Sequence, residues 1–69
     1  SAQINAFLSA LPREDRVMFV KRYWFSESLS EIAAAFAITE NNVSVRLSRI
    51  RGKLHKHLRR YLYDGSYNR

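Results

Sequence analysis

Apolar residues recur every three to four positions along most of the chain, which is the spacing of amphipathic helices rather than of strands. The first stretch with this spacing, residues 4–11, is interrupted at Pro12. A proline suits the first position of a new helix, and the acidic Glu14 and Asp15 favour the positive end of that second helix, which is expected to run to about Trp24. Its expected inward side chains are Met18, Phe19, Tyr23 and Trp24.

Two further helices are marked by capping residues. Ser28 with Glu31 three positions later is a capping box, so a short third helix is expected to begin near Leu29. After a turn at residues 37–38, Thr39 is a favourable N-cap for a fourth helix. The expected inner face of the third helix is Ile32, Ala33 and Phe36.

The fourth helix carries one apolar stripe with no break before Asp64-Gly65, so it is expected to run for about 24 residues. The stripe comprises Val43, Leu47, Ile50, Leu54, Leu58 and Tyr61. Residues 1–65 are therefore expected to form a single domain, followed by a flexible tail at 66–69. The pattern predicts an all-α, small four-helix domain with a helix-turn-helix and no winged elements.

Charge is distributed unevenly over the 69 residues, whose formal net charge is +6. Residues 1–40 hold four basic and five acidic side chains, whereas residues 41–69 hold eight basic and one acidic. This asymmetry indicates a polyanionic partner for the second part of the chain. No apolar run approaches the roughly 20 residues of a membrane span, so we expect a small, soluble, basic domain.

The sequence contains no constellation typical of a catalyst. It has no cysteine, and His55 and His57 are two positions apart, so they face different sides of a helix and are expected to be solvated. No serine lies in a strand–turn–helix elbow, and there is no glycine-rich phosphate loop. We therefore expect no catalytic residue, no metal and no cofactor.

A short helix, a tight turn and a longer helix with a polar outer face are typical of a helix-turn-helix, whose second helix fits the major groove of DNA. The outward residues at the start of the fourth helix would read base edges; they are Glu40, Asn41, Ser44, Val45, Ser48 and Arg49. Among them, Arg49 has the chemistry for a bidentate contact with guanine and Asn41 for one with adenine. Glu40 can accept from cytosine, and the Val45 methyl groups can meet a thymine methyl.

Basic residues on the flanks of that helix, Arg46, Arg51 and Lys53, are expected to hold phosphates, which position a helix but carry little sequence information. The complete set of candidate DNA-binding residues is Thr39, Glu40, Asn41, Asn42, Ser44, Val45, Arg46, Ser48, Arg49, Arg51 and Lys53.

Other interpretations of the pattern remain open. The chain also fits the DNA-binding domain of a response-regulator-type activator, or a basic helical module that binds an acidic protein. Residues 46–63 are basic and amphipathic, as in a helix that lies on a membrane surface. The polar residues Asn41 and Ser44 on the same helix argue against membrane binding. Trp24 and Phe25 are either core or part of a protein-binding patch.

The order and spacing of these residues carry a family resemblance. The matching positions are Leu11-Pro12, Arg16, Phe19, Arg22-Tyr23, Ser28, Glu31-Ile32-Ala33, Phe36-Ala37-Ile38-Thr39, Val43, Arg46-Leu47, Arg49, Arg51 and Leu54. Together they resemble region 4 of bacterial sigma-70-type RNA polymerase sigma factors, most closely the extracytoplasmic-function group. The match runs without gaps from about Leu11 to Leu58.

The resemblance implies a cytoplasmic domain that takes part in bacterial transcription initiation. Its last helix would bind the −35 element of double-stranded promoter DNA while the domain docks on the β flap of RNA polymerase, and an anti-sigma factor would be a possible partner. A sigma factor also needs a region 2, so the chain is expected to be a fragment of a longer protein.

Several positions depart from the family pattern and leave the target DNA sequence open. Ala37 stands where the family favours glycine, so a left-handed backbone there would be strained by about 1 kcal/mol or avoided. Asn42 replaces the family's usual threonine, Ser44 a frequent lysine or arginine, and Val45 a frequent serine. Gly52 replaces a basic residue.

Overall fold

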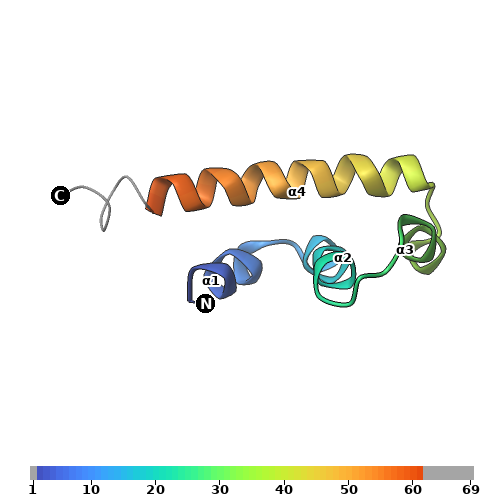
Figure 1. Cartoon of the computed structure of the whole chain (residues 1–69), viewed down its shortest axis with the longest axis horizontal. Coiled ribbons are helices and arrows are strands. Elements are labelled where there is room, and N and C mark those ends of the chain that lie inside the picture. Colours follow the sequence, from blue (N-terminus) through green and yellow to red (C-terminus); the bar gives the residue numbers. More distant parts are fainter. Residues whose placement is uncertain (1, 62–69) are drawn as a thin grey trace.

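The computed structural model describes residues 2–61, which form four helices. These are α1 (Ala2–Ala10), α2 (Arg13–Tyr23), α3 (Leu29–Phe36) and α4 (Glu40–Tyr61). In Figure 1 the three shorter helices follow one side of α4 in chain order, with α3 beside its N-terminal end. Each of them packs against α4, which confirms the predicted all-α helix-turn-helix fold. Within residues 2–61 no helix is long and apolar enough to cross a membrane.

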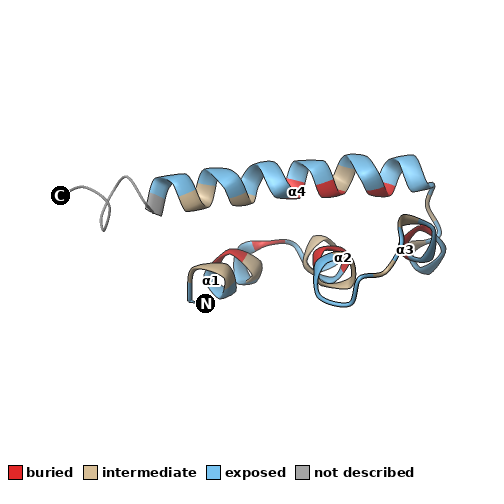
Figure 2. Cartoon of the chain, in the orientation of Figure 1, coloured by how far each residue is buried: buried red, intermediate tan, exposed pale blue. Residues whose placement is uncertain are grey.

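The core lies where α1, α2 and α3 face α4, as the buried positions in Figure 2 indicate. The predicted stripe of α4 is confirmed at Val43, Leu47 and Ile50, which are at most 1% exposed, and continues with the half-buried Leu54 and Leu58. The buried residues are Phe7, Leu11, Met18, Phe19, Ile32, Ala33, Val43, Leu47 and Ile50. The predicted core side chain of Tyr61, the helix end at Asp64-Gly65 and the tail at 66–69 lie outside what the structure describes.

Side-chain caps fix where α3 and α4 begin. At α3, the Glu31 amide donates to Ser28 Oγ at 3.0 Å, and the Ser28 amide donates to Glu31 Oε1 at 2.7 Å, which completes the predicted capping box. At α4, Thr39 Oγ1 accepts from the Asn42 amide at 3.0 Å. Both N-cap predictions are confirmed, and the Thr39 cap fixes where the turn between α3 and α4 ends.

That turn uses a left-handed residue that is not glycine. Ala37 has φ 58° and ψ 42°, so the strained backbone is adopted rather than avoided. The Ile38 amide donates to the Ala33 carbonyl at 3.0 Å and the Ala37 amide to the Ala34 carbonyl at 3.3 Å. This pair of bonds is a Schellman motif, which satisfies carbonyl groups at the end of α3 and directs the chain into α4.

The end of α2 differs from the sequence prediction. Met18 and Phe19 are buried as expected, but Tyr23 is 45% exposed and Trp24 is 69% exposed. Trp24 is the C-cap of the helix and is five positions after the buried Phe19, which places it about 140° around the helix from that residue. The placement of Tyr23 and Trp24 in the core was therefore wrong. Trp24 and Phe25 are both exposed, and their use as a protein-binding patch stays a prediction.

Candidate nucleic-acid interface

The outer face of the first half of α4 is exposed along its whole length. Val43 and Leu47 turn toward the other helices, and they are 0% and 1% exposed. The helical repeat then places the residues between them on the opposite side. The predicted base readers Glu40, Asn41, Ser44, Val45, Ser48 and Arg49 are all exposed, as is Asn42. The structure therefore brings these seven side chains onto a surface that a DNA groove can reach.

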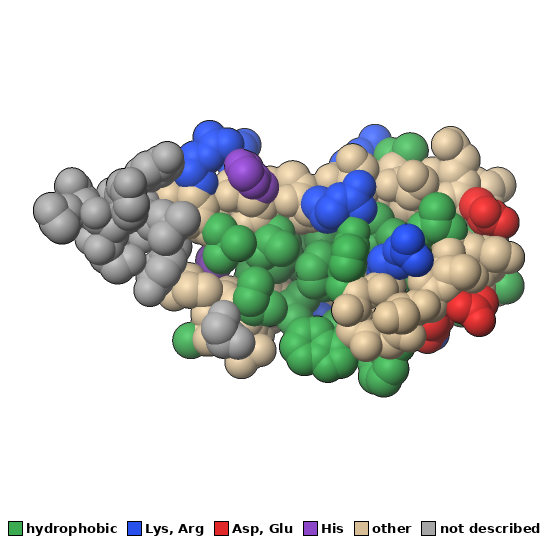
Figure 3. All heavy atoms as spheres, in the orientation of Figure 1, with side chains coloured by type: hydrophobic (Ala, Val, Ile, Leu, Met, Phe, Trp, Pro, Cys, Tyr) green, Lys and Arg blue, Asp and Glu red, His purple; other side chains and the backbone are tan. Residues whose placement is uncertain are grey.

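Basic side chains extend this surface toward the C-terminal half of α4. A shallow hollow there is lined by Arg49, Gly52, Lys53, His55, Lys56 and Arg59. Arg49, Lys53 and Lys56 form no ion pair with any residue between 2 and 61. Figure 3 shows most of the visible basic side chains over α4, whereas the visible acidic ones gather near α3. The unpaired cations give this face of α4 the charge that a phosphate backbone requires.

Arg46 is placed differently from the other predicted phosphate ligands. Its Nη2 lies 2.9 Å from Asp15 Oδ1 and 3.3 Å from Glu14 Oε1, both on α2. The hydrogen bond to the Asp15 carboxylate is the main reason why the pKa of Arg46 is raised, and Glu14 adds to it. Arg46 is thus held by two carboxylates of its own chain.

Arg51 is exposed but also has a partner on α2. Its Nη1 donates to the hydroxyl oxygen of Tyr23 at 2.6 Å. The ring of Tyr23 packs on the buried ring of Phe19, with 4.8 Å between ring centroids. Sequence reasoning missed Glu14, Asp15 and Tyr23 as partners of α4. Nothing in their spacing points to a contact with residues about thirty positions away.

The two histidines occupy different environments. His55 is exposed as expected, but His57 is half-buried. The ring of His57 lies 5.6 Å from that of Phe7 on α1, and its Nε2 has no hydrogen-bond partner among the described residues. The prediction of two solvated histidines was therefore wrong for His57. Within residues 2–61 no group of three His, Cys, Asp or Glu side chains is arranged for a metal ion.

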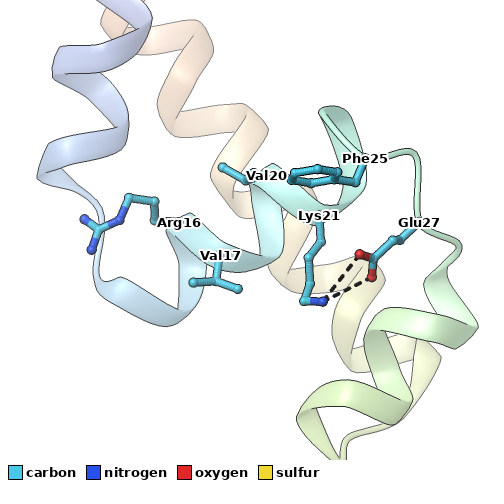
Figure 4. A pocket seen from close by; sticks show the side chains of 6 residues that line it. All are labelled: Arg16, Val17, Val20, Lys21, Phe25 and Glu27. Atoms are coloured by element: carbon cyan, nitrogen blue, oxygen red, sulfur yellow. Dashed lines mark hydrogen bonds and ion pairs between the residues drawn. The ribbon is translucent and has the colours of Figure 1, made fainter.

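A second exposed surface lies on α2 and the segment after it. Phe25 is 67% exposed, and with Val17 and Val20 it forms the apolar wall of a hollow of about 520 Å³. Figure 4 shows Lys21 Nζ directed at both carboxylate oxygens of Glu27 at the rim, with distances of 3.3 and 3.4 Å. We call this hollow, together with Trp24, the aromatic surface. An exposed apolar area of this kind is typical of protein-binding sites.

One comparison with known proteins gives a match. The family model described as Sigma-70, region 4 matches residues 1–54, which include α1, α2, α3 and the first part of α4. No curated protein and no solved structure matches the chain significantly.

Proposed function

The chain belongs to the sigma-70 region 4 family, and on that premise we propose that α4 recognises the −35 element of promoter DNA while the domain is docked on RNA polymerase. DNA binding and a part in transcription initiation come with the family. The proposal that α4 recognises the −35 element is supported mainly by one observation. The exposed polar face of α4 lies opposite the buried stripe, in which Val43, Leu47 and Ile50 are at most 1% exposed.

Within this proposal, side chains at the start of α4 divide into two roles. Asn41, Ser44, Val45 and Ser48 lie on the exposed face, where base edges of a major groove would be reached. Arg49 has no carboxylate partner among the described residues, so its guanidinium is free to bind guanine. Lys53 follows one turn later and would hold a phosphate.

The test compares Arg49→Ala with Lys53→Ala on two duplexes. One duplex is enriched by the chain from a randomised library, and the other is a scrambled duplex of the same composition. Arg49→Ala is expected to lose about 1–3 kcal/mol of discrimination, whereas Lys53→Ala weakens both duplexes alike. If Arg49→Ala lost the same affinity for both duplexes, Arg49 would not be a residue that reads a base. No enrichment of any sequence by the wild-type chain would contradict promoter recognition.

Docking on the polymerase is the second part of the proposal. The aromatic surface supports it, because Trp24 and Phe25 are 69% and 67% exposed, and because Val17 and Val20 line the adjacent hollow. The β flap is the expected docking partner on the polymerase, and an anti-sigma factor would be expected to compete for a surface of this kind.

The docking test uses Phe25→Ser, with Val45→Ser as a matched exposed apolar residue on α4. Binding to RNA polymerase core enzyme is measured by the fluorescence anisotropy of labelled chain. The Phe25 variant is expected to bind about tenfold more weakly, because an aromatic side chain at the centre of an interface contributes most of its energy, whereas the Val45 variant binds normally. A larger loss of polymerase affinity in the Val45 variant than in the Phe25 variant would mean that the chain docks through another surface.

A further inference from the structure

Helix α2 contacts α4 through polar groups at both of its ends. Asp15 in the first turn of α2 holds Arg46 at 2.9 Å, and Tyr23, its last residue, holds Arg51 at 2.6 Å. Arg46 and Arg51 are five positions apart, which is about 140° around a helix. They therefore lie on opposite flanks of the buried stripe, and α2 forms a polar contact with α4 on each side of that stripe.

The partner of Arg46 makes this arginine a poor ligand for DNA. Asp15 and Glu14 both lie within 3.3 Å of its guanidinium. A phosphate that approached Arg46 would meet two carboxylates of the same charge as itself. Lys53, about two turns further along the same flank, has no such partner among the described residues.

Tyr23 is fixed although it is 45% exposed. Its ring lies against the buried Phe19, with 4.8 Å between ring centroids and 41° between ring planes. The hydroxyl oxygen is therefore held at a defined position, from which it accepts the hydrogen bond of Arg51.

Directional contacts of this kind constrain the rotation of α4 about its own axis, which burial of the apolar core does not constrain by angle. Burial of the α4 stripe is non-directional, because its free energy follows the apolar area removed from water and not the angles between particular groups. A rotation of about 20° nevertheless moves the tips of side chains about 5–6 Å from the axis by about 2 Å. That displacement is enough to break hydrogen bonds to base edges, which weaken steeply with poor geometry.

We propose that Asp15–Arg46 and Tyr23–Arg51 are positioning contacts that fix the rotation of α4, and that Arg46 does not bind a phosphate. This inference rests on the proposed function, since it assumes that α4 lies in a DNA groove. It gives Arg46 a positioning role in place of the predicted phosphate contact. The sequence specificity of the chain then depends on four side chains of α2 and α4 that touch no base: Asp15, Tyr23, Arg46 and Arg51.

The experiment measures binding of the enriched and the scrambled duplex by fluorescence anisotropy at several salt concentrations. The variants are Asp15→Asn, Arg46→Gln and Tyr23→Phe, the last of which removes only the hydroxyl group. Each is expected to reduce the preference for the enriched duplex by about fivefold to tenfold, a range typical of coupled contacts. The slope of log affinity against log salt should stay that of the wild type, because no phosphate contact is lost.

Lys53→Gln is the matched control, because it removes one charge from the same flank without breaking an ion pair. Its salt slope should fall by about 0.9, with the preference between duplexes retained. Two double variants complete the test. Arg46→Gln combined with Asp15→Asn should lose no more preference than either single variant, and Arg51→Gln combined with Tyr23→Phe no more than Tyr23→Phe alone, because each pair acts as one contact. Circular dichroism and urea unfolding verify that every variant compared is folded.

Two results would overturn the inference while the proposed function stands. One is an Arg46→Gln variant that weakens both duplexes equally and loses as much salt slope as Lys53→Gln, since Arg46 would then be a phosphate ligand. The other is an unchanged duplex preference in folded Asp15→Asn and Tyr23→Phe variants. A wild-type chain that binds both duplexes equally overturns the proposed function, and with it this inference.

Discussion

At the scale of single residues, two turns of this chain use left-handed backbone without glycine. Ser26, between α2 and α3, has φ 55°, and Ala37, between α3 and α4, has φ 58°. A side chain with a Cβ atom is strained in this region by about 1–2 kcal/mol. The hydrogen bonds of Ala37 and Ile38 to the end of α3 hold the second turn in place in spite of that cost.

Ala37→Gly is accordingly expected to stabilise the domain by about 1 kcal/mol, since glycine has no Cβ to strain and its greater freedom in the unfolded chain offsets only part of the gain. Urea unfolding followed by circular dichroism measures the change. The matched control is Ala34→Gly, an exposed alanine within α3, which should lose about 1 kcal/mol instead. A destabilised Ala37→Gly variant would mean that the left-handed turn is not a source of strain.

At the scale of helices, α4 combines a buried half with a more exposed half. Val43, Leu47 and Ile50 are almost fully buried against α2 and α3, whereas Leu54 further along is only half-buried. Gly52 lies between these parts on the exposed side, and no atom lies within 4 Å of the position that a Cβ atom would take there. The fold therefore offers no packing reason for a glycine within this helix.

Gly52→Ala tests whether that glycine serves DNA binding. The substitution is expected to stabilise the chain by about 1 kcal/mol, because glycine is a poor residue for a helix interior. Urea unfolding measures the stability, and binding to the enriched duplex is measured in parallel. If α4 approaches a DNA backbone at Gly52, affinity falls while stability rises. Unchanged affinity would make Gly52 a tolerated defect of the helix.

Elements of this fold were predictable wherever one residue type determines a local structure. Ser28 and Thr39 cap α3 and α4 through their own side-chain oxygens. Pro12 was predicted at the first position of α2 and immediately precedes that helix, as its N-cap. The buried stripe of α4 was equally predictable, because helical spacing alone separates its two faces. The exposed candidate readers follow from the same spacing.

The rest of the site depends on contacts between distant residues, which spacing does not reveal. Glu14 and Asp15 were interpreted as favourable charges at the start of α2, and their second role with Arg46 appears only when α2 crosses α4. Trp24 follows the apolar pattern of α2 but lies past its last residue. His57 was assigned to solvent because α1 was not known to lie beside it.

At the scale of the whole molecule, the two proposed partners would use different surfaces. The outer face of α4 points away from the three shorter helices, whereas the aromatic surface lies on α2 and the segment after it. Two valines mark these surfaces and are almost equally exposed: Val45 on α4 at 40% and Val17 on α2 at 37%. They form a matched pair, because the same substitution at either position removes the same side chain and changes the net charge by the same amount.

The most direct test of the central claim, that the outer face of α4 lies in duplex DNA, is the affinity of Val45→Asp and Val17→Asp for the enriched duplex at one salt concentration. Val45→Asp should bind at least about tenfold more weakly, because its carboxylate would face base edges and phosphates, while Val17→Asp should stay within about twofold of the wild type. Equal losses in the two variants, or a larger loss for Val17→Asp, would contradict the account.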